Sequence, residues 1–115
     1  MRSRQMENRD QYHLTVAKKE LTKALRQIAK FKKKAGKAEM MMLSFDNRLL
    51  RFSMTNVSVG VPAMGVWPAD VLAPAFAIYL LAKVPMTADP VEITVSDGRM
   101  RIGSSVIEVQ WVRDG

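Results

Sequence analysis

The residues of this chain best suited to binding chemistry are nine lysines and arginines between positions 18 and 37, KKELTKALRQIAKFKKKAGK, with Glu20 as the one acid among them. Nine cations less one acid give this segment a net charge of +8, whereas the whole chain of 115 residues carries +7. The charge excess therefore sits on one short segment. Such a concentration of positive charge predicts a polyanionic partner, nucleic acid first and an anionic membrane surface second.

The same segment has the apolar spacing of an amphipathic helix. Four apolar residues recur at i, i+3, i+4 and i+7, which predicts a helix over 18–34 that ends near Gly36. These residues are Leu21, Ala24, Leu25 and Ile28. At about 100° per residue, a group of cations occupies one arc opposite this apolar stripe. The group consists of Lys19, Lys23, Arg26, Lys30, Lys33 and Lys34.

A solvated helix face is the plain alternative, but such faces normally mix charges, because opposite charges four residues apart stabilise a helix and like charges repel. Binding to an anionic lipid surface is another alternative. However, the apolar stripe is expected to pack against the sheet, which leaves no apolar side chains on this helix to insert into the lipid. The face has no Asn or aromatic residue, one Arg, and Gln27 at its margin, so it suits phosphates better than base edges. We therefore expect sequence-independent binding of DNA phosphates. The candidate DNA-binding residues are Lys19, Lys23, Arg26, Lys30, Lys33, Lys34 and Lys37.

Catalytic and metal-binding chemistry lack candidates in the sequence. There is no cysteine, and His13 is the single histidine. The eleven acids are scattered, which leaves no nucleophile–base pair and no cluster of metal ligands. The six glycines are isolated, so no glycine-rich phosphate loop is expected. We predict a protein that is not an enzyme and that holds no cofactor or metal.

The composition along the chain predicts one domain behind a short tail. Residues 1–11 are polar, mixed in charge and without periodicity, which predicts a flexible N-terminal tail and no signal peptide. Residues 12–115 have the usual length of a single domain. The longest apolar stretch, 71–85, is interrupted by Pro74 and Lys83 and is shorter than the roughly 20 residues of a membrane span. We expect a soluble, cytoplasmic protein without a membrane partner.

Alternating and helical periods predict the same order of elements in both halves of the chain. Each half, 12–67 and 69–112, contains a strand, a helix and three strands. We therefore predict an α+β fold with two strand–helix–three-strand halves, an antiparallel sheet and two helices on one face. The predicted strands are 12–17, 39–45, 48–54, 56–67, 69–73, 91–95, 99–103 and 105–112, and the second helix is 75–83.

Short turn signals separate these strands. Asp46-Asn47 is a favourable hairpin pair, and Asp97-Gly98 is a stronger one. Pro62 cannot donate to a sheet ladder, which predicts an edge position or a bulge at that point.

Four segments together resemble one domain of a DNA sliding clamp, most closely a domain of the bacterial replicative clamp. They are LTVAKKELTKALRQI, MMLSFDNRLLRFSMTNVSVGVPAMGV, LAPAFAIYLLAKVP and VEITVSDGRMRIGSSVIEVQW. In that family a strand runs into a helix, and a strand pair with an acidic turn follows. A helix started by Pro and a hairpin with a D-G-type turn then complete the domain. The resemblance covers about 12–112 and consists of element order and turn positions, without a catalytic signature.

The resemblance implies a ring-forming protein that encircles duplex DNA, with helices lining the hole and sheets forming the outer wall. It also implies an internal two-fold repeat and a DNA-facing role for the cations of the first helix. Clamp chains carry two or three such domains, whereas we expect one here. The second helix, AFAIYLLAK, has Lys83 as its one charge. Its apolar residues run nearly all round the helix, so some are expected to be exposed unless a partner covers them.

Two functions are open at this point. The first is a clamp-like, sequence-independent DNA-binding protein that forms a homo-oligomer. The second is a clamp-fold module for protein–protein interaction that uses the second helix or a sheet edge, without encircling DNA. Unpaired sheet edges favour self-association, because the last predicted strand, 105–112, carries Glu108 as its one charge.

Overall fold

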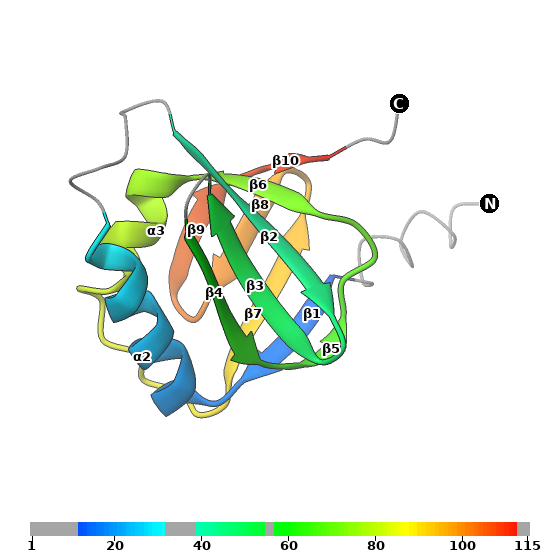
Figure 1. Cartoon of the computed structure of the whole chain (residues 1–115). Helices are drawn as coiled ribbons and strands as arrows, with labels where there is room; N and C mark the ends of the chain where they lie inside the picture. Colours follow the sequence, from blue (N-terminus) through cyan, green and yellow to red (C-terminus); the bar gives the residue numbers. More distant parts are fainter. Residues whose placement is uncertain (1–11, 32–38, 55–56, 113–115) are drawn as a thin grey trace.

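The helices and strands follow the predicted order along the chain (Figure 1). The computed structural model describes residues 12–31, 39–54 and 57–112. The first half forms β1 (His13–Val16), α2 (Lys18–Ala29), β2 (Met40–Asp46), β3 (Leu49–Met54), β4 (Val57–Pro62) and β5 (Met64–Val66). The second half forms β6 (Val71–Pro74), α3 (Ala75–Leu81), β7 (Val91–Ser96), β8 (Arg99–Ile102), β9 (Ser105–Glu108) and β10 (Gln110–Trp111). The order strand, helix, three strands therefore occurs twice, and a further short strand closes each half.

The strands form two antiparallel sheets, so the prediction of a single sheet is wrong. Sheet I has the order β5-β1-β7-β8-β9, and sheet II has the order β10-β6-β2-β3-β4. Each sheet takes a run of three strands from one half of the chain and two strands from the other half, β1 and β5 in sheet I and β6 and β10 in sheet II. Alternation in a sequence predicts which side of a strand is buried but not which strand lies next to it. The sequence pattern therefore could not distinguish one sheet from two.

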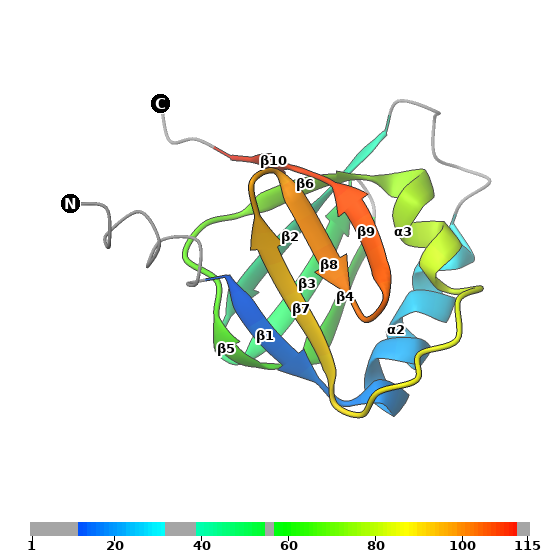
Figure 2. The same ribbon diagram turned by 180° about the vertical axis from the view of Figure 1, so that it is seen from behind.

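The two sheets face each other across one shared core (Figures 1 and 2). Large side chains from both sheets are fully buried in it. They include Leu14, Ile93 and Ile102 of sheet I and Leu43, Leu50 and Phe52 of sheet II. Both helices lie side by side at one end of the sheet pair, where they close the core (Figures 1 and 2). Their buried residues belong to the same apolar cluster as those of the strands.

The chain changes sheet at two corresponding places. β4 is an edge strand of sheet II and ends at Pro62, which confirms the edge position predicted from the proline. After Ala63 the chain enters β5 in sheet I. In the second half, β9 is an edge strand of sheet I, and after Val109 the chain enters β10 in sheet II. The predicted final strand, 105–112, is therefore two strands that lie in different sheets.

The β2–β3 hairpin turns one residue later than the sequence predicts. Asp46 pairs with Leu49, so Asn47 and Arg48 are the two central residues, with φ of 53° and 64°. A two-residue turn with positive φ at both positions matches the twist of the flanking strands. A register shifted by one residue would move Phe52 from the core to the solvent side. Core burial therefore overrides the preference for an Asp-Asn turn. The β7–β8 turn lies where it is predicted, with positive φ at both central residues.

Gly65 in β5 is a position where only glycine fits the pairing with β1. Its φ is +136°, and a Cβ there would collide with the carbonyl oxygen of His13. Gly65→Ala is therefore expected to lower the free energy of unfolding by about 2 kcal/mol or more. Gly60→Ala in β4 is the matched control, because a Cβ there meets only ordinary contacts at 3.9 Å. Chemical denaturation measures both variants, and equal stability would contradict the close approach of β5 to β1.

Candidate nucleic-acid interface

α2 is oriented by its apolar stripe, which is buried in the shared core. The four residues of the stripe, Leu21, Ala24, Leu25 and Ile28, are between 0% and 4% exposed. The opposite side of the helix is therefore turned to solvent. It carries the exposed residues Lys19, Lys23, Arg26 and Lys30. The predicted orientation of these cations is confirmed, and their role in DNA binding stays a prediction.

The helix itself is shorter than predicted. α2 ends at Ala29, and Lys30 is its C-terminal cap, whereas the sequence pattern predicts a helix to residue 34. The other candidate cations, Lys33, Lys34 and Lys37, lie outside the described residues.

The N-terminus of α2 is held by a residue from the other half of the chain. Asp89 Oδ1 accepts a hydrogen bond of 3.0 Å from the backbone N–H of Lys18. This carboxylate satisfies one of the free N–H groups of the first turn and lies at the positive end of the helix dipole. Ala17 at the cap position supplies no such side chain. The sequence analysis missed Asp89, because a cap that comes from 71 residues away leaves no local spacing signal.

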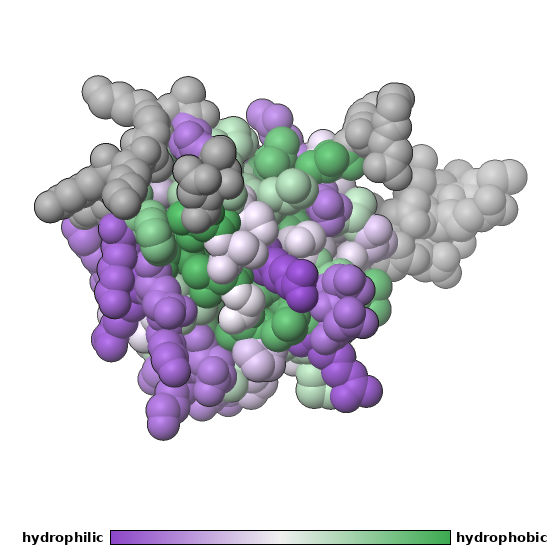
Figure 3. Space-filling model, in the orientation of Figure 1, coloured by the Kyte–Doolittle hydropathy of each residue, from purple (hydrophilic) through white to green (hydrophobic). Residues whose placement is uncertain are grey.

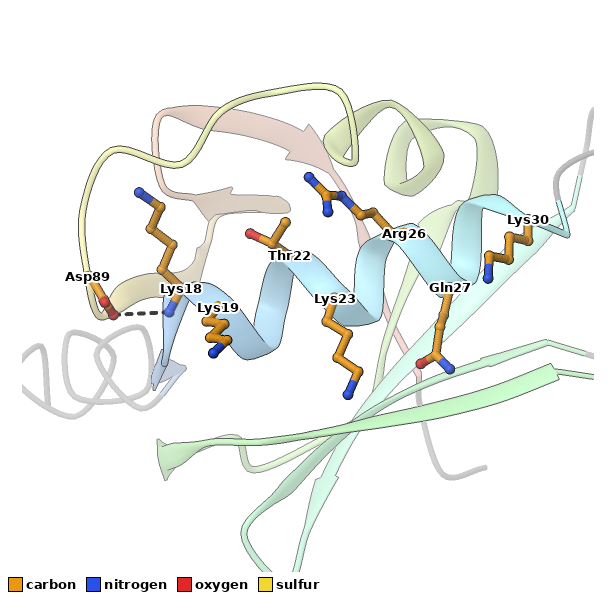
Figure 4. Close-up of a pocket in the computed structure, with 8 residues that line it drawn as sticks. All are labelled: Lys18, Lys19, Thr22, Lys23, Arg26, Gln27, Lys30 and Asp89. Atoms are coloured by element: carbon orange, nitrogen blue, oxygen red, sulfur yellow. Dashed lines mark hydrogen bonds between the residues drawn. The ribbon is translucent and has the colours of Figure 1, made fainter.

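A groove, called here the basic groove, runs along the outer side of α2 (Figure 4). Its lining residues are Lys18, Lys19, Thr22, Lys23, Arg26, Gln27, Lys30 and Asp89. Five of these residues are cations and one is an acid. At 1.5 Å of rise per residue, the cations from Lys19 to Lys30 extend over about 16 Å of helix. The groove therefore suits an elongated anion with repeated charges better than a single small one.

The cations of the basic groove form no ion pairs with the described carboxylates. No ion pair joins any of these lysine and arginine side chains to a carboxylate within the described part of the chain. Figure 3 shows hydrophilic side chains gathered over this helix. Like charges one turn apart repel by a few tenths of a kcal/mol for each pair. This repulsion between the cations therefore lowers the stability of the helix.

α3 lies beside α2 and has a different character. Phe76 and Leu80 are 59% and 53% exposed, which confirms that part of this apolar helix faces solvent. They are four residues apart and so lie on one side of the helix, and exposed Lys83 follows beyond its C-terminal end. On the buried side, the hydroxyl of Tyr79 donates to Met54 Sδ at 3.5 Å. Burial raises the pKa of the Tyr79 hydroxyl, so this group stays a neutral donor.

Other kinds of site have no support in the described residues. No three His, Asp or Glu side chains in residues 12–31, 39–54 and 57–112 gather closely enough to hold a metal ion. His13 lies on the outer side of sheet I, with its Nε2 atom 3.7 Å from Glu92 Oε1. No helix in this part of the chain has the length and apolar character to cross a membrane. The basic groove and the exposed side of α3 therefore carry the most unusual surface chemistry in the described structure.

Comparisons with protein-family models, with curated proteins and with solved structures find no match to this chain. The description of the fold as α+β, with two antiparallel sheets of five strands and two helices, therefore comes from the structure alone. The likeness to sliding clamps stays a prediction from element order.

Removal of the Asp89 cap is expected to weaken α2. Asp89→Ala should lower the free energy of unfolding by about 1 kcal/mol, because the Lys18 N–H loses its acceptor. Asp89→Asn is the matched control, since its amide oxygen can still accept the hydrogen bond, and it should retain most of the stability. Urea denaturation followed by circular dichroism measures the difference. If Asp89→Ala is as stable as the unmodified protein, the hydrogen bond does not contribute to holding the helix.

Proposed function

We propose that this protein binds DNA without catalysis and without sequence preference, through a sliding-clamp-like domain whose α2 contacts phosphates. The observation that carries the proposal is the exposed side of α2, where cations of one sign line the basic groove and no described carboxylate pairs with them. DNA is a dense polyanion, and its condensed counterions are released when lysine and arginine replace them. Phosphate binding also relieves the repulsion between the cations along the helix.

The side chains of the basic groove suit phosphate contact better than base readout. Lysine is a point charge, whereas base edges are read mainly by Arg, Asn and Gln in bidentate geometry. The groove contains one Arg, Arg26, and one Gln, Gln27, but no Asn. Sequence-independent binding is the expected result.

The arrangement of the elements supports the clamp-like part of the proposal. Each half of the chain contributes one helix, and both helices lie at the same end of the sheet pair (Figures 1 and 2). A domain built in this way can present both helices to DNA while its sheets face outward, as the resemblance to clamps implies. The cations from Lys19 to Lys30 then occupy the side that meets the phosphates.

The edges of sheet I support assembly into a homo-oligomer. β5 and β9 are its outer strands, and they expose Met64 by 72%, Val66 by 53% and Val106 by 51%. Edge strands with apolar side chains and unpaired backbone groups are templates for pairing with another chain. An isologous dimer is the simplest closed assembly that would cover such an edge.

A protein–protein interaction module is the alternative function, and the same apolar edges favour it. In that case the exposed side of α3 or an edge strand, β5 or β9, binds another protein without encircling DNA, and the cations of α2 serve solubility alone. The two functions differ in DNA binding, which only the first one requires.

Charge reversal on α2 is expected to abolish DNA binding. The unmodified protein should lose affinity with rising salt at a log–log slope of about −4, at roughly −0.9 for each phosphate contact. Two unrelated DNA sequences of equal length should bind alike. The triple variant Lys19→Glu, Lys23→Glu, Arg26→Glu should show no binding in fluorescence anisotropy, because its groove repels phosphate.

The control for this experiment is the variant Arg51→Glu, Arg99→Glu, Arg101→Glu. It changes the net charge by the same amount, at exposed strand positions outside the basic groove. It should retain most of the affinity, because charges beyond about 10 Å are largely screened at moderate salt. An unmodified protein that binds no DNA at low salt, or two variants with equal losses, would refute the proposal.

Assembly is expected to depend on the edge strand β9. Light scattering should give a mass above the monomer value of 12.9 kDa at moderate salt. Val106→Lys should return the protein to a monomer, because a charge on an edge strand opposes pairing. Leu80→Lys on α3 is the matched control and should leave the mass unchanged. A mass near 12.9 kDa at every concentration would contradict the prediction of a homo-oligomer. If Leu80→Lys alone produced a monomer, the interface would lie on α3 and not on β9.

A further inference from the structure

The exposed side of α3 provides an aromatic surface next to a strip of cations. Phe76 and Leu80 lie one turn apart and are both more than half exposed, and Lys83 follows them. This set of three residues is called here the α3 outer face. The helix is anchored without it, since the buried residues of α3 are Ala75, Ile78, Tyr79 and Leu81. Packing within the described residues therefore does not explain why a phenylalanine stands at position 76.

The helix that carries the basic groove and the helix that carries the α3 outer face are neighbours. α2 and α3 pack against each other at one end of the sheets, and both bury their inner sides in one core (Figures 1 and 2). Each helix therefore exposes the side that is turned away from this core. In Figure 4, Arg26 and Thr22 extend from α2 toward the side where α3 lies, whereas Lys23 extends the opposite way. Arg26 therefore lies on the part of the basic groove nearest to α3.

The combination of these two surfaces matches the chemistry of one ligand class. Proteins that bind single-stranded nucleic acid without sequence preference pair a positively charged track for the backbone with aromatic side chains on which bases stack. α2 provides the track but no exposed aromatic residue within the basic groove. Phe76 of the neighbouring helix provides the aromatic surface. A base pair inside a duplex has no free face, because its neighbours in the stack cover both sides.

We propose that the nucleic acid bound at α2 is single-stranded, and that one of its bases stacks on the ring of Phe76 while its phosphates follow the basic groove. Leu80 extends the apolar surface under the base, and Lys83 meets a phosphate beyond it. This inference rests on the proposed function, because it specifies the form of nucleic acid that the same surface binds. The cations beside the α3 outer face favour a polyanionic strand over an apolar protein segment as its occupant.

The test compares three ligands by fluorescence anisotropy at moderate salt. They are a thymidine strand of about 20 nucleotides, an abasic strand of the same length, and a duplex of about 20 base pairs. The unmodified protein should bind the thymidine strand most tightly. Phe76→Ala should weaken binding of the thymidine strand by about tenfold and leave the abasic strand unaffected, because only the first ligand has bases to stack.

Two further variants separate stacking from general apolar contact. Phe76→Tyr keeps an aromatic ring and should retain the affinity for the thymidine strand. Phe76→Leu keeps an apolar side chain without the ring and should lose affinity as Phe76→Ala does. Gln110→Ala on β10 is the control at an exposed, uncharged position outside the basic groove, and it should change none of the three affinities.

The outcomes distinguish this inference from the proposed function. Equal binding of the thymidine and abasic strands, with no effect of Phe76→Ala, would overturn the stacking inference while phosphate binding at α2 stands. If none of the three ligands bound, both the stacking inference and the proposed DNA binding would be overturned. A fall in molecular mass with Phe76→Ala, without a loss of affinity for the thymidine strand, would identify the α3 outer face as a protein interface and so also overturn the inference.

Discussion

The burial of four α2 side chains, Leu21, Ala24, Leu25 and Ile28, sets the direction of every cation on that helix. Each large apolar side chain contributes about 1.5–3 kcal/mol when it is fully buried, whereas repulsion between neighbouring like charges costs a few tenths. Burial of the apolar side chains therefore determines how the helix is rotated about its axis. The charged side consequently faces solvent. The basic groove is the consequence of this imbalance, with Asp89 holding the start of the helix in place.

The second constraint on the structure is the exchange of strands between the two halves of the chain. β1 lies between β5 and β7, and β6 lies between β10 and β2, so each sheet is completed by two strands from the other half. Both sheets and both helices consequently share one core. Aromatic contacts support the closure, since the ring of Tyr12 packs edge-on against those of Trp67 and Trp111, at centroid distances of 5.3 Å and 6.1 Å. This exchange is what brings α2 and α3 together at one end.

The two helices occupy corresponding places in the repeated plan, yet they present different chemistry. α2 exposes cations and α3 exposes Phe76 and Leu80. Considered one helix at a time, α2 has charge without an aromatic residue, and α3 has an apolar surface without a charge. Their combined surface, in contrast, has both a strip of cations and an exposed aromatic ring. A function that depends on this combination is visible only once the two helices are placed side by side.

The sequence by itself determined which side of each element is buried, because the periods of helices and strands follow from local backbone geometry. The periods correctly predict that Lys19 and Arg26 face solvent, and the proline correctly predicts an edge position at Pro62. Only the tertiary structure decided that the strands form two sheets, that the chain changes sheet at Val109, and that Asp89 caps α2. Each of these features joins segments that are far apart along the chain. Local periodicity does not encode such partners, since they are selected by how all the apolar faces are buried together.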